Sequence, residues 1–178
     1  MATTLNALTL LCRLGGVLQE DVTGVSRRLD KTMAESFVNG NQPGQANHLW
    51  LRENILLAMD ANEDLDLYNF TGLDIGCGAG EDLFGKPVTY QSVVGFLIEN
   101  LGPGTLKIGG NGTAQAWYFP FDDVNTNKVV VLPGGFALFG TKTGSPDGGY
   151  PVSVGIYQFR LGAVSDSLSY NLYMAGID

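Results

Sequence analysis

Short apolar runs closed by glycine, proline or asparagine fill the middle of this chain, from Val88 to Gly140. One of these runs, residues 93–98, places apolar side chains on both faces, which is typical of a strand that is buried on both sides. The segment 100–104 follows it with Asn, Pro and two Gly residues, the composition of a tight turn. Leu106 and Ile108 then alternate with polar residues, as in a half-buried strand. This spacing predicts consecutive antiparallel strands.

Further apolar runs continue the pattern to the end of the sequence. Residues 150–161 change phase in the middle, because the apolar side chains move to the opposite parity after Ile156, and this slip predicts a bulge or a strand bend. Residues 168–174 alternate cleanly between apolar and polar side chains. With roughly nine or ten strands and no convincing helix after residue 35, we predict an all-β fold, an antiparallel β-sandwich or jelly roll.

The first 31 residues fit a strand and a helix about equally well. Residues 8–14 alternate as in a strand, whereas Leu11, Leu14 and Leu18 have helical spacing, and Gly15-Gly16 interrupts either pattern. An apolar but irregular terminal segment can pack on a neighbouring subunit or form an edge strand or short helix on its own domain. We therefore divide the chain into an irregular N-terminal arm or edge segment, residues 1–35, and a β-sandwich domain, residues 36–178.

The charge balance argues against a nucleic-acid partner. Ten Lys and Arg residues face eighteen Asp and Glu residues, which gives a formal net charge of −8, and such a chain repels a phosphate backbone. Four of the basic residues lie in the first 31 positions. No apolar run reaches the ~20 residues of a membrane helix, and the first residues lack the basic region of a signal peptide. We expect a soluble, unprocessed protein in which Cys12 and Cys77 are free, buried thiols.

The segment Leu73–Gly80, LDIGCGAG, resembles motif I of the class I S-adenosylmethionine-dependent methyltransferases. The resemblance implies that the cofactor would contact four residues of this segment: Asp74, Gly76, Gly78 and Gly80. The following residues depart from that family, because Phe96 or Leu97 stands where an acidic residue should bind the ribose, and no alternation of strands and helices follows. Gly80–Lys86 also matches a phosphate-binding loop, but Pro87 replaces its Ser or Thr.

The remaining candidate sites have a plain structural interpretation beside the functional one. Asp60–Asp66 begins like an EF-hand loop but lacks its Gly and its Glu, so it is a solvated acidic turn or a looser calcium site. His48 is the only histidine and has no nucleophile motif near it in sequence, which favours a structural role. Asn69–Thr71 and Asn111–Thr113 are glycosylation sequons that we interpret as turns. We assign no catalytic residue, no cofactor site and no metal site.

Aromatic residues are dense at 117–121, where Trp117, Tyr118, Phe119 and Phe121 surround Pro120. Such a group can form a platform for sugars or protein partners when it is exposed. When it is buried, it is part of the hydrophobic core. A carbohydrate-binding, lectin-like sandwich that uses Trp50 or Trp117 is therefore an alternative function.

From about Ser36 to Asp178 the chain resembles small virion structural proteins of tailed phages and prophages. The resemblance rests on the segments SFVNGN, DLDLYNF, VTYQSVVGFLIENL, TLKIGGNGTAQAW, VVVLPGGFALFG, PVSVG and SYNLYMAGID. It implies a β-sandwich that assembles with copies of itself, often as trimers, and with other virion proteins. We therefore expect a virion component of the capsid, head decoration or tail, made in the host cytoplasm, with no enzymatic activity. The alternatives are the lectin-like module and the methyltransferase.

Overall fold

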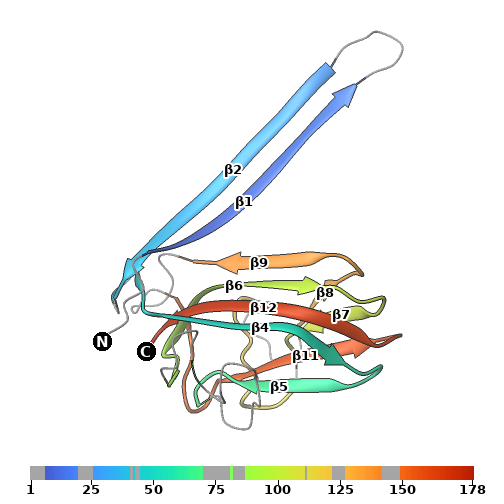
Figure 1. Ribbon diagram of the computed structural model, residues 1–178. Helices are drawn as coiled ribbons and strands as arrows, with labels where there is room; N and C mark the ends of the chain where they lie inside the picture. The colour runs from blue at the N-terminus through green and yellow to red at the C-terminus, as the bar shows by residue number, and fades with distance from the viewer. Residues whose placement is uncertain are drawn as a thin grey trace.

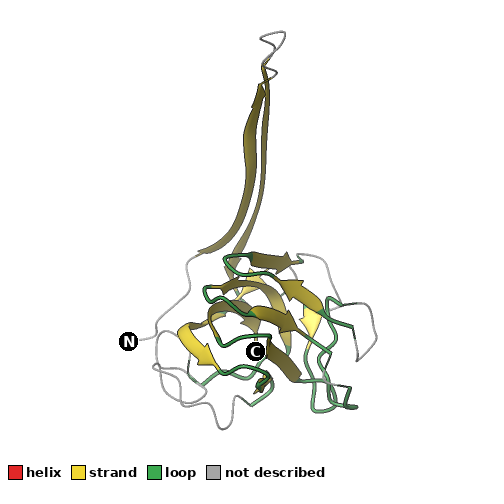
Figure 2. Cartoon of the chain, turned by 90° about the vertical axis from the view of Figure 1, so that its right-hand side faces the viewer, coloured by secondary structure: helices red, strands yellow, loops and turns green. Residues whose placement is uncertain are grey.

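The computed structural model shows an all-β chain in which a long hairpin projects from a compact sandwich (Figures 1 and 2). It describes residues 7–19, 26–40, 42, 45–69, 81, 87–110, 112–121, 127–141 and 149–178, with the backbone alone described up to residue 35. Two sheets stack face to face in the sandwich, and a third, small sheet contains the hairpin. The predicted all-β antiparallel sandwich is therefore confirmed.

The first layer of the sandwich is a five-stranded sheet. Its main path runs in the order β10 (Tyr150–Pro151), β6 (Ser92–Asn100), β12 (Leu168–Ile177) and β4 (His48–Leu57). β9 (Phe136–Gly140) also pairs with β6, further along that strand from β10. The strand that comes last in sequence, β12, is thus central, and β4 and β6 flank it in antiparallel register.

The second layer is a four-stranded sheet in the order β5 (Asn62–Asp66), β11 (Gln158–Val164), β7 (Thr105–Ile108) and β8 (Val129–Val131). Every pairing in it is antiparallel. Side chains of alternate residues, such as Leu106 and Ile108 on β7, are fully buried against the first layer, as their alternation predicted. The same holds for β12, where Leu168, Tyr170, Leu172 and Met174 are buried.

An aromatic cluster fills the space between the layers. Phe96 on β6 contacts three other rings with centroids 5.0 to 6.0 Å away, those of Trp117, Phe139 and Phe159. Trp117 is fully buried, and its indole N–H donates to the carbonyl of Pro151 at 2.9 Å. The aromatic segment 117–121 therefore contributes to the core at Trp117 and Phe121, but it is not the strand that we expected. Apart from an isolated bridge at Ala116, it connects to no ladder, because Pro120 has no backbone N–H to donate.

Two of the connections between the layers lie where the sequence predicted a turn or a bend. The predicted turn at 100–104 leads from β6 in one layer to β7 in the other, and Asn100 is buried there, donating to the carbonyls of Gly104 and Val131 at 2.8 and 3.0 Å. The phase slip in 150–161 has a similar cause. β10 belongs to the five-stranded sheet and β11 to the four-stranded one, and a tight turn between Ser153 and Ile156 separates them. The predicted bend is therefore a crossover between the layers.

The N-terminal arm is regular, in contrast to our expectation. β1 (Ala7–Gln19) and β2 (Ser26–Asn39) pair in antiparallel register from Ala7–Val38 to Gln19–Ser26. Gly15 and Gly16 lie inside β1 and do not interrupt it. β2 continues to Asn39, past the boundary that we drew at residue 35, and then pairs in parallel with the short strand β3 (Gln45–Ala46).

A second, smaller core joins the foot of the hairpin to the sandwich. Phe37 on β2 and Ala46 on β3 are fully buried, and they cluster with Val94, Ala175 and Ile177 of the five-stranded sheet. Ala175 and Ile177 lie on the face of β12 opposite Met174, which points into the main core. The foot therefore covers one end of the outer face of the five-stranded sheet. This explains the second apolar face of residues 93–98 at Val94, whereas Leu97 on the same face is partly exposed.

Candidate assembly surfaces

The outer face of the five-stranded sheet carries an apolar row beyond the foot of the hairpin. Register aligns four residues from four neighbouring strands across it: Leu51 on β4, Tyr173 on β12, Leu97 on β6 and Leu138 on β9. Each is partly exposed. Phe136 on β9 and Leu56 on β4, 65% and 75% exposed, lie on the same face by alternation and register. We call this surface the apolar row. The apolar row is continuous with the small core. The pair next to Leu51–Tyr173 on this face is Leu49–Ala175, and both of its residues belong to or pack against the small core.

Two carboxylates lie beside the apolar row. The hydroxyl of Tyr173 donates to Glu53 at 2.8 Å, and the amide of Asn171 donates to Glu99 at 2.9 Å. The hydrogen bond to Glu53 is the main reason why the pKa of Tyr173 rises to about 12; burial and the charge of Glu99 add to it. The described cations of the sandwich lie elsewhere: Arg52 faces the core, and Lys107, Lys128 and Arg160 belong to the other sheet. The outer face is therefore apolar with negative charges.

The projecting hairpin combines apolar and basic positions. Cross-strand partners share a face of a hairpin, so the register places one set of residues on the face of Phe37. On β1 these are Leu8, Leu10, Cys12, Leu14, Gly16 and Leu18, and on β2 they are Glu35, Met33, Lys31, Leu29 and Arg27. We call this set the leucine face. Arg13 and Arg28 lie on the opposite face. The four cations of the first 31 residues, noted from sequence, thus all belong to the hairpin.

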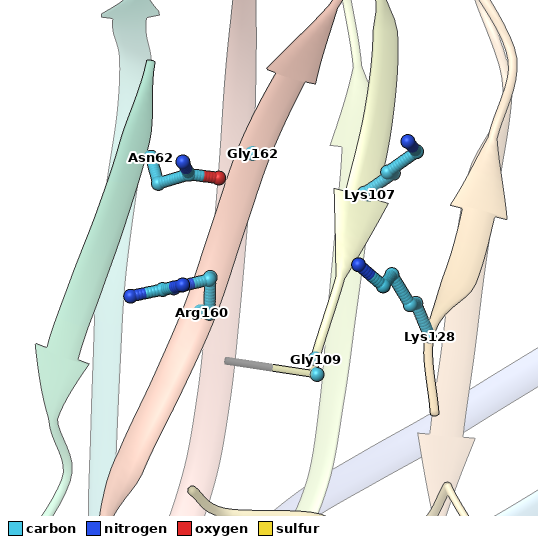
Figure 3. A pocket seen from close by; sticks show the side chains of 7 residues that line it. Asn62, Lys107, Gly109, Lys128, Arg160 and Gly162 are labelled. Carbon is cyan, nitrogen blue, oxygen red and sulfur yellow. The ribbon is translucent and has the colours of Figure 1, made fainter. Parts of the chain in front are cut away.

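The outer face of the four-stranded sheet is different in character. A shallow hollow of about 170 Å³ opens there, lined by seven residues from all four strands or their ends, with Lys107 and Lys128 on one side (Figure 3). Figure 3 shows Asn62 pointing from β5 toward Gly162, while Arg160 points back toward β5. Arg160 donates two hydrogen bonds to Asp64, at 2.6 and 2.7 Å, so its charge is already compensated. The hollow offers two lysine ammonium groups but no nucleophile or acid–base pair.

The predicted acidic turn is largely a strand, and its carboxylates have partners. Asn62–Asp66 forms β5, in which Asp64 pairs with Arg160, and Asp66 accepts hydrogen bonds from the backbone of Tyr68 and Asn69 at 2.9 Å. Within the described residues no three His, Cys, Asp or Glu side chains are grouped so that they could hold a metal ion. The geometry of β5 thus matches a structural role for these acidic residues.

Glu63, the remaining acidic residue of β5, joins the two layers through a buried polar triad. Arg52 on β4 donates to Glu63 at 2.6 Å and to the hydroxyl of Tyr170 at 2.8 Å, and that hydroxyl donates to Glu63 at 2.7 Å. Burial is the main cause of a strongly raised pKa for Tyr170, with the charge of Glu63 next. A phenol held protonated in this way is a hydrogen-bond donor and cannot serve as a base. Local sequence patterns do not reveal the triad, because Tyr170 lies more than 100 residues from Arg52 and Glu63 in the chain.

The only histidine has a structural contact. His48 begins β4, is 5% exposed, and its Nε2 lies 3.0 Å from Oδ2 of Asp178. Asn47 also hydrogen-bonds to the Asp178 carboxylate. Burial raises the pKa of Asp178, but the hydrogen bonds from His48 and Asn47, the charge interaction with His48 and a backbone hydrogen bond leave this pKa below its ordinary value. These contacts connect the end of β12 to the beginning of β4.

Several sequence candidates lie outside the described residues. These are all of Leu73–Gly80, which includes Cys77, all of Gly80–Lys86 except Glu81, Asn111 of the second sequon and Thr71 of the first. Cys12 lies in β1, where the backbone alone is described. The described part of the chain has no helix with the length and apolar character to span a membrane.

Comparison of the chain with protein-family models, with curated proteins and with solved structures found no match in any of the three.

Proposed function

We propose that this chain is a structural assembly protein of a phage virion, a capsid, head-decoration or tail component that acts through contacts with copies of itself. The observation that carries the proposal is the hairpin. Its two strands share 13 registered pairs and extend about 40 Å at ~3.3 Å per residue. A two-stranded hairpin that packs on nothing is at best marginally stable in water, and both of its edges offer unpaired backbone groups.

A hairpin of this length therefore needs a partner surface. Its foot packs on the sandwich through the described side chain of Phe37, and the backbone of the rest projects away from the sandwich (Figures 1 and 2). Neighbouring copies in an assembly would supply the missing contacts, and the apolar row provides a second surface that assembly would bury. The virion setting comes from the resemblance of residues 36–178 to phage structural proteins.

The two alternatives have less support. A lectin-like site on Trp50 or Trp117 needs an exposed ring, and both side chains are fully buried. A class I methyltransferase needs strands alternating with helices, and the described residues form strands without any helix. No observation favours either function over assembly.

Light scattering coupled to size exclusion tests the proposal directly. We expect a molar mass of at least two chains at micromolar concentration, and particles larger than one 19.0 kDa subunit by electron microscopy. The variant Leu10→Asp with Leu14→Asp, on the leucine face, should reduce the mass toward a monomer. Thr9→Asp, on the opposite face, is the matched control. A monomer at all concentrations would refute the proposal, and detection of the protein in purified virions by mass spectrometry would test the setting.

A further inference from the structure

From this assembly function we infer one specific contact: the leucine face of the hairpin of one copy docks on the apolar row of a second copy. The inference rests on the proposed function and names the surface that receives the arm. Three observations carry it: the outer face already binds part of the hairpin, the two surfaces match in charge, and the contact is large enough.

The first observation is the foot of the hairpin. Phe37 belongs to the leucine face by register, and it is fully buried on the outer face of the five-stranded sheet of its own chain. The apolar row begins two residues further along the same strands, at the next pair on this face, because Leu49–Ala175 belongs to the small core and Leu51–Tyr173 follows. The sheet surface that accepts Phe37 in its own subunit thus continues uncovered. A leucine face from outside would extend the same kind of packing.

The second observation is charge. The outer face offers Glu53 and Glu99 beside the row, and the leucine face places Lys31 and Arg27 toward the distal half of the hairpin. Beyond the hairpin, from residue 40 onward, the sequence contains six basic and fourteen acidic residues. The cations of the arm therefore meet an acidic subunit, and attraction between opposite charges favours encounter and fixes the register of the contact.

The third observation is size. A hairpin of 13 pairs is about 40 Å long, and two strands ~4.8 Å apart present a face about 10 Å wide, so one face covers roughly 400 Å². Counting both partners, one docked arm buries about 800 Å². In a closed dimer each copy donates one arm and receives another, so two such contacts bury about 1,600 Å² in total, about 800 Å² per copy, which is the size of a standard stable interface. A two-fold symmetric dimer satisfies this exchange.

Cysteine cross-linking in the full chain tests the contact. In a Cys77→Ser background, Leu97→Cys introduces a thiol in the apolar row, and Cys12 remains on the leucine face. Mild oxidation should give a disulfide-linked dimer on a non-reducing gel, which disappears when Cys12→Ser is added. Val130→Cys is the matched control, because Val130 is 53% exposed on the other sheet. It should give no cross-link that depends on Cys12.

Assembly measurements give an independent readout. We expect Leu97→Asp to raise the dissociation concentration at least tenfold, and Val130→Asp to leave it within about twofold. Leu138→Asp, on the neighbouring strand β9, replaces Leu97→Asp if circular dichroism shows that the latter does not fold. Charge reversal provides a further check: Glu99→Lys and Lys31→Glu should each weaken assembly, and the double variant should recover at least half of the loss.

The outcomes separate the two levels of the argument. A wild-type chain that stays monomeric would overturn the proposed function and the contact together. An oligomer that survives Leu97→Asp and Leu138→Asp, and that forms no cross-link through Cys12, would overturn the contact and leave the assembly function in place. A cross-link that depends on Cys12, together with dissociation by the aspartate variants, would establish the contact.

Discussion

The buried triad of Arg52, Glu63 and Tyr170 predicts an asymmetry that stability measurements can test. Arg52 and Glu63 tie the two layers together, with the Arg52 side chain 6% exposed and that of Glu63 23% exposed. Removing one member of a buried ion pair costs about 3–5 kcal/mol, because the other charge is left without compensation. The cost should therefore depend on which charge remains in the protein and how much water reaches it.

Arg52→Met leaves the Glu63 carboxylate, which keeps some water and the hydroxyl of Tyr170, so we expect a loss of about 3 kcal/mol, the lower end of that range. Glu63→Leu leaves a guanidinium with almost no access to water, and we expect a loss of about 5 kcal/mol. The double variant removes both charges and should cost less than either single change, since a well-packed apolar pair replaces the ion pair.

Urea unfolding followed by tryptophan fluorescence measures these losses. With a slope of about 2 kcal/mol per molar urea, Arg52→Met should lower the midpoint by roughly 1.5 M, and Glu63→Leu by roughly 2.5 M. All variants are compared at one protein concentration, because assembly makes stability depend on concentration. Equal losses for the two single variants, or a double variant with the sum of both, would refute the reasoning.

Three further predictions concern the core, the turns and pH. Trp117→Ala should cost about 3–5 kcal/mol in urea unfolding, because it empties a fully buried site among aromatic rings. Gly104→Ala should lower the melting temperature clearly, since a Cβ there would lie 2.3 Å from the carbonyl oxygen of Asp166, whereas Gly155→Ala meets no atom within 4 Å and should change it little. Because the pKa of Asp178 is lowered in the folded protein, its carboxylate stabilises the fold at pH values above the ordinary pKa of 3.8. This stabilisation is lost as the pH falls through the pKa of the folded state. Wild type should therefore lose more stability on acidification below about pH 4 than Asp178→Asn does; equal acid sensitivity would contradict the assignment.

The layered fold was predictable because its signals are local. Alternation in 168–174 and the double-sided burial of 93–98 depend on neighbouring residues, and both agree with the structure. The arm was not predictable, because Leu8–Leu18 satisfies strand and helix spacing alike, and the pairing with Ser26–Asn39 that decides between them is not local. Likewise, the aromatic run 117–121 has a strand-like composition. Nevertheless it does not join a sheet, because Pro120 has no backbone N–H to donate and the run lies in a connection between the layers.

The candidate surfaces were harder to predict for the same reason. The apolar row unites residues from four strands, and only the register between those strands brings Leu51, Leu97 and Leu138 into line. One signal did exist in the sequence: residues 93–98 are apolar on both faces, which requires a partner on each side. The foot of the hairpin covers part of the second side, and the remainder is what we assign to a neighbouring copy.

The central place of β12 has a consequence for biosynthesis. β4 and β6 do not pair with each other, and both pair with β12, which follows them by more than 60 residues, whereas the other edge of β6 pairs with β9 and β10. A nascent chain therefore cannot close this layer until residues 168–177 have left the ribosome. Until then the edges of β4 and β6 that will pair with β12 stay unpaired. During this interval a chaperone can bind them, or two chains can associate prematurely.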